Sequence, residues 1–185
     1  STTRRGAEDS ASAEVTTSSS CRRPVNEARS AGSWAGRTTM RNAYGPTETT
    51  CSVTLTEPLA PGRPVTIGRP MVGVTALLLD RRLRPVPVGA VGELYIVSPA
   101  VARGYLGAAG QTAGRFVAAP TGGARMFRTG DRARASTAGD FEFLGRTDDQ
   151  IKLRGFRIEL REIDSALQDA PGVASSATAL APSPS

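Results

Sequence analysis

From Trp34 onward the chain alternates short apolar runs with glycine and proline, which limits it to short strands joined by turns. Three of these runs are rich in leucine, aromatic or β-branched side chains: Thr75–Asp80, Glu93–Val97 and Phe141–Leu144. We predict a strand at each of them. Turns that contain proline or glycine separate the runs. The sequence therefore predicts a β-rich meander or barrel over residues 62–147.

Two helices are expected beside these strands. The first is short and lies near Gln111–Phe116, and the second covers Glu162–Ala170. In the second segment the apolar residues that recur at helical spacing are Ile163, Ala166 and Leu167. A proline–glycine pair follows and ends this helix. A weak strand is expected over Val173–Ala179, so the fold class is α+β and β-rich.

Residues 1–32 have a different character. Serine and threonine dominate, and the apolar side chains larger than alanine are Val15, Cys21 and Val25. No helical or strand period can be found in this segment. Its low apolar content cannot offset a backbone ordering cost of ~1–2 kcal/mol per residue. We therefore expect it to be disordered and to contain no packed element.

Composition excludes several classes of protein. The chain has 185 residues and no histidine, which removes Ser-His-Asp hydrolysis and histidine-based metal sites. Its net charge of +6 comes from arginines placed singly or in pairs, without the block expected of a nucleic-acid groove binder. No apolar run approaches the ~18 residues of a membrane span, and no signal segment opens the chain. The two cysteines lack metal-ligand spacing, which favours a reducing, cytoplasmic setting.

The string NAYGPTE, residues 42–48, is the most informative motif. A Gly-Pro pair reverses the chain at the end of a strand and exposes an aromatic ring on one side and a hydroxyl and a carboxylate on the other. This combination suits a nucleotide: Tyr44 would stack on the base, and Thr47 and Glu48 would face phosphates and their Mg²⁺. Taken alone, the motif is equally consistent with a polar turn that has a packed tyrosine.

Further motifs follow in a fixed order. They are GELYI (92–96) with VARGYL (101–106), FRTGD (127–131) and GRTDDQIKLRGFRIEL (145–160). Together with NAYGPTE, this set resembles the adenylate-forming, or AMP-binding, superfamily. More closely, it resembles the adenylation domains of nonribosomal peptide synthetases. The likeness runs from about Trp34 to the end of the chain and covers only the later portion of such a domain.

The resemblance implies a site for ATP. Thr47 would contact the α-phosphate, and Glu48 would hold Mg²⁺. Tyr44 would stack on one face of the adenine, with Phe143 at the aromatic position on the other face. Asp131 would accept hydrogen bonds from both ribose hydroxyls, since a carboxylate has two acceptor oxygens.

The resemblance also assigns roles beside the nucleotide. Arg146 would lie beside ribose and phosphate, and Lys152 would act from the mobile side of the site. Asp148 falls at the hinge about which a small C-terminal subdomain swings between the two half-reactions. The positions that match the amino-acid pocket are Ala43, Cys51 and Ser52. We expect Cys51 to be a small buried side chain and not a nucleophile.

The implied reaction is the activation of an amino acid. Its carboxylate attacks the α-phosphorus of ATP and pyrophosphate leaves; the acyl group then passes to the phosphopantetheine thiol of a peptidyl carrier domain. No general base is needed, because the nucleophile is already ionised, which agrees with a chain that has no histidine. The implied partners are the amino acid, the carrier domain and the remainder of a multidomain synthetase, with no nucleic acid and no membrane.

The resemblance divides the chain. Residues 33–147 would be the late part of the large adenylation subdomain, including part of its distorted β-barrel, and residues 148–185 would start the small C-terminal subdomain. The Gly/Ser/Thr-rich phosphate loop and the late catalytic lysine of such domains are not found in these residues. We therefore expect an incomplete adenylate-forming fold, a fragment without activity of its own.

Two alternatives remain open at this point. One is a fragment of an acyl- or aryl-CoA ligase of the same superfamily, and the other is a non-functional remnant. The Asp148–Gln150 step and the RGFRIEL string favour the peptide-synthetase branch, and the abrupt change of character near Ser33 favours the remnant. The amino acid cannot be named, because most pocket-lining positions are absent.

Overall fold

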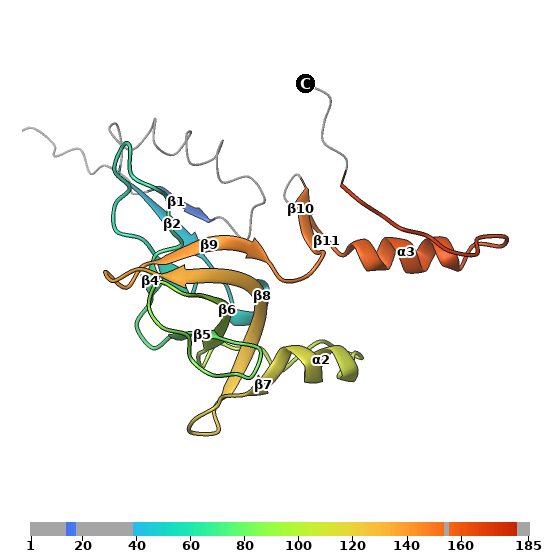
Figure 1. Ribbon diagram of the computed structural model, residues 1–185, viewed down its shortest axis with the longest axis horizontal. Helices are drawn as coiled ribbons and strands as arrows, with labels where there is room; N and C mark the ends of the chain where they lie inside the picture. Colours follow the sequence, from blue (N-terminus) through green and yellow to red (C-terminus); the bar gives the residue numbers. More distant parts are fainter. Residues whose placement is uncertain (1–13, 18–38, 154–155, 181–185) are drawn as a thin grey trace, which may run out of the picture.

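The structure is a computed structural model that describes residues 14–17, 39–153 and 156–180 (Figure 1). Its elements, in chain order, are β1 (Glu14–Thr17), β2 (Met40–Tyr44), the 3₁₀-helix η1 (Thr47–Thr49), β3 (Thr54–Leu55), β4 (Arg69–Pro70), β5 (Thr75–Leu79), β6 (Val91–Val97), α2 (Ala109–Arg115), β7 (Phe116–Ala118), β8 (Arg125–Ala135), β9 (Phe141–Arg146), β10 (Ile151–Leu153), β11 (Phe156–Ile158) and α3 (Leu160–Gln168). Strands outnumber helices, so the predicted β-rich α+β class is confirmed.

The larger sheet carries most of the core. Its antiparallel strands lie in the order β5-β6-β8-β7, and β9 pairs with β8 on the same side as β7. β6 is buried on both faces: Leu94 and Ile96 face one apolar cluster, and Tyr95 faces the other. The first cluster consists of Tyr44, Val53, Ile67, Leu78, Leu94, Ile96, Ala133 and Phe141. It draws on both sheets and so holds them together.

The smaller sheet, β1-β2-β3-β4, meets the larger one at the start of β9. Ile67 donates its N–H to the carbonyl of Phe141, and Phe141 donates its own to Gly68, each over 2.9 Å. Gly68 has φ +79°, and a Cβ there would lie 2.1 Å from the carbonyl carbon of Leu55. Only glycine fits a left-handed position that another backbone approaches so closely. This junction and the first apolar cluster join the two sheets into one β-rich body, which we call the barrel.

Most predicted elements are confirmed. β5, β6 and β9 occupy the three predicted strands, and α2 and α3 lie within two residues of the predicted helix starts. β8 is the longest strand, with 11 residues, and was not predicted. The strand predicted over Val173–Ala179 is wrong: these residues carry no strand. Ser176 instead donates a hydrogen bond to the carbonyl of Asp164, which ties this segment to α3.

The N-terminal segment contains one element that the sequence pattern did not reveal. Glu14–Thr17 forms β1, which pairs with β2 in parallel register, Glu14 opposite Met40 and Thr17 opposite Ala43. The expectation of no packed element within residues 1–32 is therefore wrong for these four residues. The other residues of that segment lie outside the described part of the chain.

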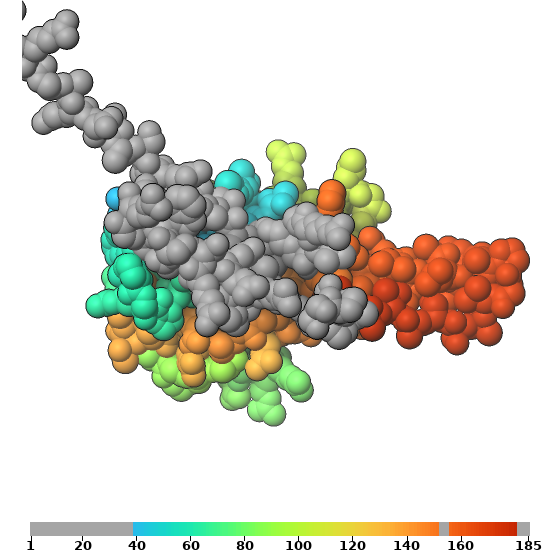
Figure 2. All heavy atoms as spheres, turned by 90° about the horizontal axis from the view of Figure 1, so that it is seen from above, coloured from blue at the N-terminus to red at the C-terminus, as the bar shows by residue number. Residues whose placement is uncertain are grey.

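The C-terminal elements stand apart from the barrel. β10 and β11 form a separate two-stranded antiparallel hairpin, and α3 projects from it, away from the other elements (Figures 1 and 2). No residue of α3 is buried, and its apolar residues Ile163 and Leu167 are exposed. Among the described residues, the β10–β11 hairpin is therefore not hydrogen-bonded into either of the two larger sheets.

Candidate functional site

The NAYGPTE turn leaves the barrel at the end of β2. A Cβ on Gly45 would lie 1.7 Å from the carbonyl oxygen of Cys51, so the loop of residues 50–52 folds directly onto this glycine. Thr50 and Cys51 have φ of 56° and 80°, a left-handed conformation that is uncommon for residues with a side chain. The turn is thus held in one strained shape beside the positions matched to the amino-acid pocket.

Tyr44 occupies the interior of this site. Its ring belongs to the core cluster and is 1% exposed, and its hydroxyl donates a hydrogen bond to Asp131 Oδ2. Burial and the neighbouring Asp131 carboxylate raise the pKa of Tyr44 well above its ordinary value, so the hydroxyl keeps its proton. The expectation that the turn exposes an aromatic ring is wrong. The structure instead contains the alternative reading of the motif, a polar turn with a packed tyrosine.

Asp131 and Arg146 form a buried ion pair across β8 and β9. The two residues are direct partners in the strand register, and Arg146 Nη1 lies 2.6 Å from Asp131 Oδ1. Their side chains are 3% and 6% exposed. Burial raises the pKa of Asp131, and the charge of Arg146 and the hydrogen bond from Tyr44 oppose that rise. Each oxygen of the carboxylate thus accepts one hydrogen bond from the protein.

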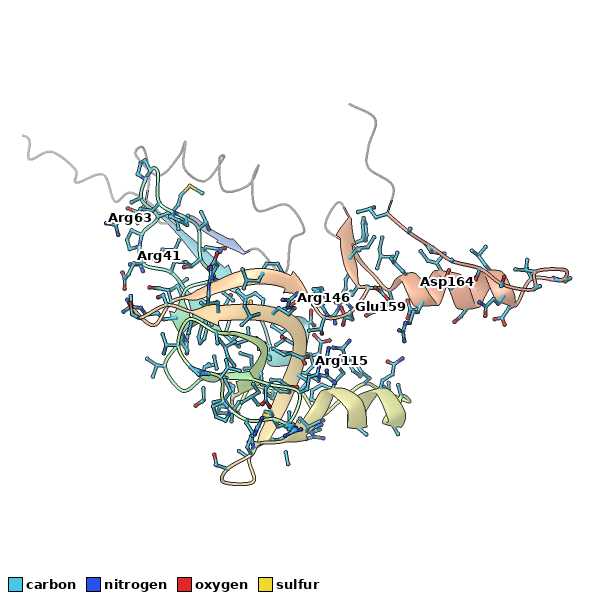
Figure 3. The ribbon with its side chains drawn as sticks, viewed as in Figure 1. Arg41, Arg63, Arg115, Arg146, Glu159 and Asp164 are labelled. Carbon is cyan, nitrogen blue, oxygen red and sulfur yellow. The ribbon has the colours of Figure 1, made fainter. Side chains whose placement is uncertain are left out.

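Arg146 extends the cluster to Asp148. Its Nε and Nη2 lie 2.7 and 3.0 Å from the two oxygens of Asp148, a bidentate pair. Arg115, at the end of α2, donates a further hydrogen bond to Asp148 Oδ2 over 2.7 Å. Burial opposes ionisation of this carboxyl, but the two arginines outweigh it and lower the pKa of Asp148 to about 2. Figure 3 shows Arg115 and Arg146 at the end of the barrel nearest the hairpin.

Glu48 is the centre of a second polar cluster. It lies in η1 and is buried, and its Oε1 accepts a hydrogen bond of 2.6 Å from the hydroxyl of Tyr105. Arg157 of β11, 109 positions later, places Nη1 2.9 Å from both carboxylate oxygens. Burial opposes ionisation, yet these partners lower the pKa of Glu48. Burial and the Glu48 carboxylate raise the pKa of Tyr105 to about 12, so its hydroxyl remains a donor.

The donor set around Glu48 decides whether Mg²⁺ fits there. No group of three or more acidic, histidine or cysteine side chains that could hold a metal occurs in residues 14–17, 39–153 and 156–180. Mg²⁺ in nucleotide sites takes only one or two carboxylates and completes its octahedron with phosphates and water. A single carboxylate therefore fits Mg²⁺ that arrives with a nucleotide, provided that Arg157 leaves the oxygens it now occupies.

The remaining predicted residues are distributed around these clusters. Thr47 is exposed in η1, and Phe143 is half-buried against the core cluster that contains Tyr44. Among the three pocket positions, Ala43 is buried, Ser52 is half-buried and Cys51 is exposed. The expectation of a buried Cys51 is therefore wrong. Lys152 lies in β10 opposite Arg157, and its side chain is outside the described residues.

Three residues of the two clusters were not predicted as site residues. Arg115 ends a helix to which the sequence assigns no function, and Tyr105 belongs to the VARGYL string, which the sequence identifies only as part of the family resemblance. Arg157 lies in the RGFRIEL string, which served only as a family marker. No local signal marked Arg157, because an arginine between two apolar residues is ordinary on the exposed face of a strand.

Comparison with known proteins places the chain in a family. The sequence profile of the AMP-binding enzyme family matches residues 7–106, more than half of the chain. The chain therefore belongs to the AMP-binding enzymes. Since the match begins at residue 7, the expectation that the likeness begins at Trp34 is wrong.

Named relatives narrow the class. The chain is 53% identical over 143 residues to the isonitrile lipopeptide synthase of Mycobacterium tuberculosis, covering 76% of this chain and 6% of the relative. It is 50% identical over 143 residues to the phosphinothricin tripeptide synthetase PhsC of Streptomyces viridochromogenes, covering 76% and 13%. The solved structure of PA1221, a nonribosomal peptide synthetase protein containing adenylation and PCP domains, superposes with a TM-score of 0.75 at 30% identity.

The chain spans only part of these proteins. It covers 34% of the PA1221 chain, while 88% of this chain is matched. The β-rich fold described above is thus a part of the adenylation-domain fold, as expected. In the described part of the chain, no helix has the length and apolar character that crossing a membrane requires.

Proposed function

We propose that the chain is the late part of a peptide-synthetase adenylation domain, which activates an amino acid as its acyl-AMP and then transfers the acyl group to the phosphopantetheine thiol of a carrier domain. One observation supports this most directly. Residues from three separate motifs form two polar clusters: Tyr44, Asp131 and Arg146 meet in one, and Glu48 is the centre of the other. The named relatives are peptide synthetases, which agrees with this assignment.

The first half-reaction needs positioning and charge neutralisation. An amino-acid carboxylate oxygen forms a bond to the α-phosphorus of ATP, and the bond to the bridging oxygen breaks, so that pyrophosphate leaves with the electron pair. The protein has no proton to remove in this step, since the nucleophile is already ionised. Mg²⁺, which Glu48 would hold, supplies charge neutralisation at the phosphates.

Asp131 and Arg146 would serve the nucleotide as a pair. The second lone pair of each Asp131 oxygen can accept a bond from a ribose hydroxyl once the covering side chains move aside. Tyr44 has no exposed face for a base in this arrangement, so adenine stacking on it requires the same rearrangement. Thr47, exposed in η1, is free to approach the α-phosphate. Phe143 remains the candidate for the other face of the adenine.

The second half-reaction takes place at the carbonyl carbon of the activated amino acid. The pantetheine thiolate forms a bond to the acyl carbonyl carbon, and AMP leaves with the electron pair of the broken bond between that carbon and the phosphate oxygen. Asp148 would be the hinge for the reorientation between the two steps, and Lys152 would act from the small subdomain. Residues 33–147 and 148–185 would be the two subdomain portions. Ala43, Cys51 and Ser52 would contribute to the amino-acid pocket.

The test is amino-acid-dependent exchange of labelled pyrophosphate into ATP. The segments that PA1221 has outside the matched region should be joined to this chain, because the chain alone is expected to show near-background exchange. In the joined protein, Glu48→Gln should lower exchange by about 10²-fold or more, the usual cost of one electrostatic contact to the reacting phosphates. Asp131→Asn should also lower exchange, because one of the two oxygens that would accept the ribose hydroxyls is lost. Glu142→Gln, which breaks only an exposed pair with Arg134, should leave exchange unchanged.

Other results would point elsewhere. Exchange that depends on fatty or aryl acids and not on amino acids would favour the CoA-ligase class, particularly if free CoA serves as the acceptor. Strong exchange by the 185-residue chain alone would contradict its incompleteness. Absence of exchange with every acid in the folded, joined protein would favour a remnant without activity.

A further inference from the structure

We propose that Arg115 is a positioning residue of this site: from the end of α2 it holds the carboxylate of Asp148 and thereby fixes the start of the C-terminal elements against the barrel. The inference deepens the proposed function, because that function makes Asp148 the hinge. The contact itself can be tested without any activity.

The first observation is the crowding of charged groups over Gly130. A Cβ at this glycine would lie 2.7 Å from Arg115 Nη1, 2.8 Å from Arg146 Nη2 and 2.8 Å from Asp148 Oδ2. Gly130 also has φ +76°, so both its backbone and its lack of a side chain leave this space to the charges. The two guanidinium groups and the carboxylate therefore lie together directly above β8.

The second observation is that the backbone carrying Arg115 is anchored. The next residue, Phe116, is buried and pairs with Phe127 of β8 in the strand register, with ring centroids 5.1 Å apart. The Tyr105 ring packs against Phe116 edge-on, 5.5 Å away. Arg115 is thus presented from a fixed point of the larger sheet.

The third observation is the balance of charge. Asp131 faces Tyr44, Arg146, Asp148 and, more remotely, Arg157. Asp148 faces Arg146 and Arg115, and lies within electrostatic reach of Arg128. Without Arg115, one close guanidinium, that of Arg146, would be shared between two carboxylates. Arg115 supplies the second positive charge, so Arg146 can remain on Asp131 while Asp148 is held in place.

The consequence concerns the attachment of the hairpin and α3. α3 has no buried residue, and among the described residues beyond residue 148 burial is confined to Gln150 and Ile151 at the start of β10, so polar contacts with the barrel contribute much of the attachment of these elements. The Arg115–Asp148 pair contacts the hinge residue itself, as the Arg146–Asp148 pair does, and each of its side chains is 26% exposed. A rotation at residue 148 must break or turn this pair. Arg115 would therefore set how readily the C-terminal elements reorient.

The experiment uses the 185-residue chain, with carboxyl NMR titration of Asp148 and hydrogen exchange of the β10 amides. In Arg115→Gln the pKa of Asp148 should rise by about one unit from its value near 2, because one of two charged donors is lost. The β10 amides should exchange roughly fivefold faster, because a change of this size corresponds to the free energy that a partly exposed ion pair contributes. Arg115→Lys should restore most of both values, which loss of packing alone would not explain.

Matched variants make the result decisive. Arg134→Gln breaks the exposed Arg134–Glu142 pair and should change neither measurement. Asp148→Asn should speed β10 exchange at least as much as Arg115→Gln does, because it also weakens the contact with Arg146, and the double variant should exchange no faster than Asp148→Asn. Unchanged exchange in Asp148→Asn, or additive effects in the double variant, would overturn the proposal. If the joined protein lacks pyrophosphate exchange, the proposed function fails, while the titration still decides the role of Arg115.

Discussion

Arg157 Nη1 lies 2.9 Å from both carboxylate oxygens of Glu48, so a residue of the C-terminal hairpin neutralises the carboxylate at the predicted cation site. The two residues differ in exposure, 7% for Glu48 and 41% for Arg157. This difference in exposure predicts that mutating Arg157 and mutating Glu48 change the free energy of unfolding by different amounts. An arginine that loses its partner can be hydrated, whereas a buried carboxylate that loses its cation cannot.

We therefore expect Arg157→Gln to lower the free energy of unfolding by about 1–2 kcal/mol, and Glu48→Gln by less, because only the former leaves a buried charge. Urea denaturation of the chain gives both values. The double variant should show a coupling of ~1 kcal/mol, against a few tenths for the exposed pair Arg134–Glu142. Equal losses in the two single variants would argue against the Arg157–Glu48 contact in solution.

The turn after β2 gives a prediction about backbone shape. In Gly45→Ala the new methyl group would overlap the carbonyl oxygen of Cys51, which lies 1.7 Å from the Cβ position, so the loop of residues 50–52 must move. We expect a loss of about 3 kcal/mol in the free energy of unfolding. Gly114→Ala is the matched control. Its Cβ position in α2 meets no neighbour within 4 Å, and alanine there should stabilise the helix by up to ~1 kcal/mol.

The sequence predicted the strands whose apolar residues are contiguous and missed the longest one. β8 contains Arg125, Arg128, Arg132 and Arg134 among its 11 residues, and these charges hide its apolar face from a search for apolar runs. Its second half in fact alternates strictly: Asp131 and Ala133 are buried, and Arg132 and Arg134 are exposed. A period of two was thus present, but a buried aspartate stood where an apolar residue is expected.

The candidate site was predictable as a set of motifs but not as a set of contacts. NAYGPTE, FRTGD and GRTDDQ indicated Tyr44, Asp131 and Arg146, and the structure brings these three together. The contacts of Arg115 with Asp148 and of Arg157 with Glu48 span 33 and 109 positions. No local pattern encodes such pairs, since tertiary packing alone brings them together. The exposure of Cys51 was missed because it depends on the left-handed turn at residues 50–51.

The buried hydroxyl of Tyr44 can be tested by removing it. In Tyr44→Phe the Oδ2 of Asp131 loses its donor while Arg146 still holds Oδ1, so a buried carboxylate oxygen is left unsatisfied. We expect a loss of about 1–3 kcal/mol in the free energy of unfolding and a further rise in the pKa of Asp131. Tyr95→Phe serves as the comparison. That hydroxyl makes only a 3.4 Å contact with Glu93, so its removal should cost much less.

The pKa of Asp148 predicts how stability depends on pH. Its ordinary value is 3.8, and the folded protein lowers it to about 2. A carboxyl with a lowered folded-state pKa stabilises the fold above its unfolded pKa and loses that contribution as the pH falls through the folded pKa. The contribution of Asp131 to the pH dependence has the opposite sign, because the pKa of Asp131 is raised in the folded protein. Protonation of Asp131 therefore cannot account for a loss of stability in acid.

The comparison between the parent chain and Asp148→Asn isolates this contribution. At pH 5 and above, the variant should be less stable than the parent chain by roughly 1–2 kcal/mol. A lowering of the Asp148 pKa by nearly two units corresponds to somewhat more than this, and solvent screening of the partly exposed pair reduces the value. The difference should shrink between about pH 4 and pH 2, where the parent carboxyl becomes protonated. Asp140→Asn, which removes a longer and more exposed pair with Arg69, should cost little at any pH. Urea midpoints measured at half-unit steps would reveal the trend, and a difference that stays constant down to pH 2 would show that Arg115 and Arg146 do not hold Asp148 in its ionised form.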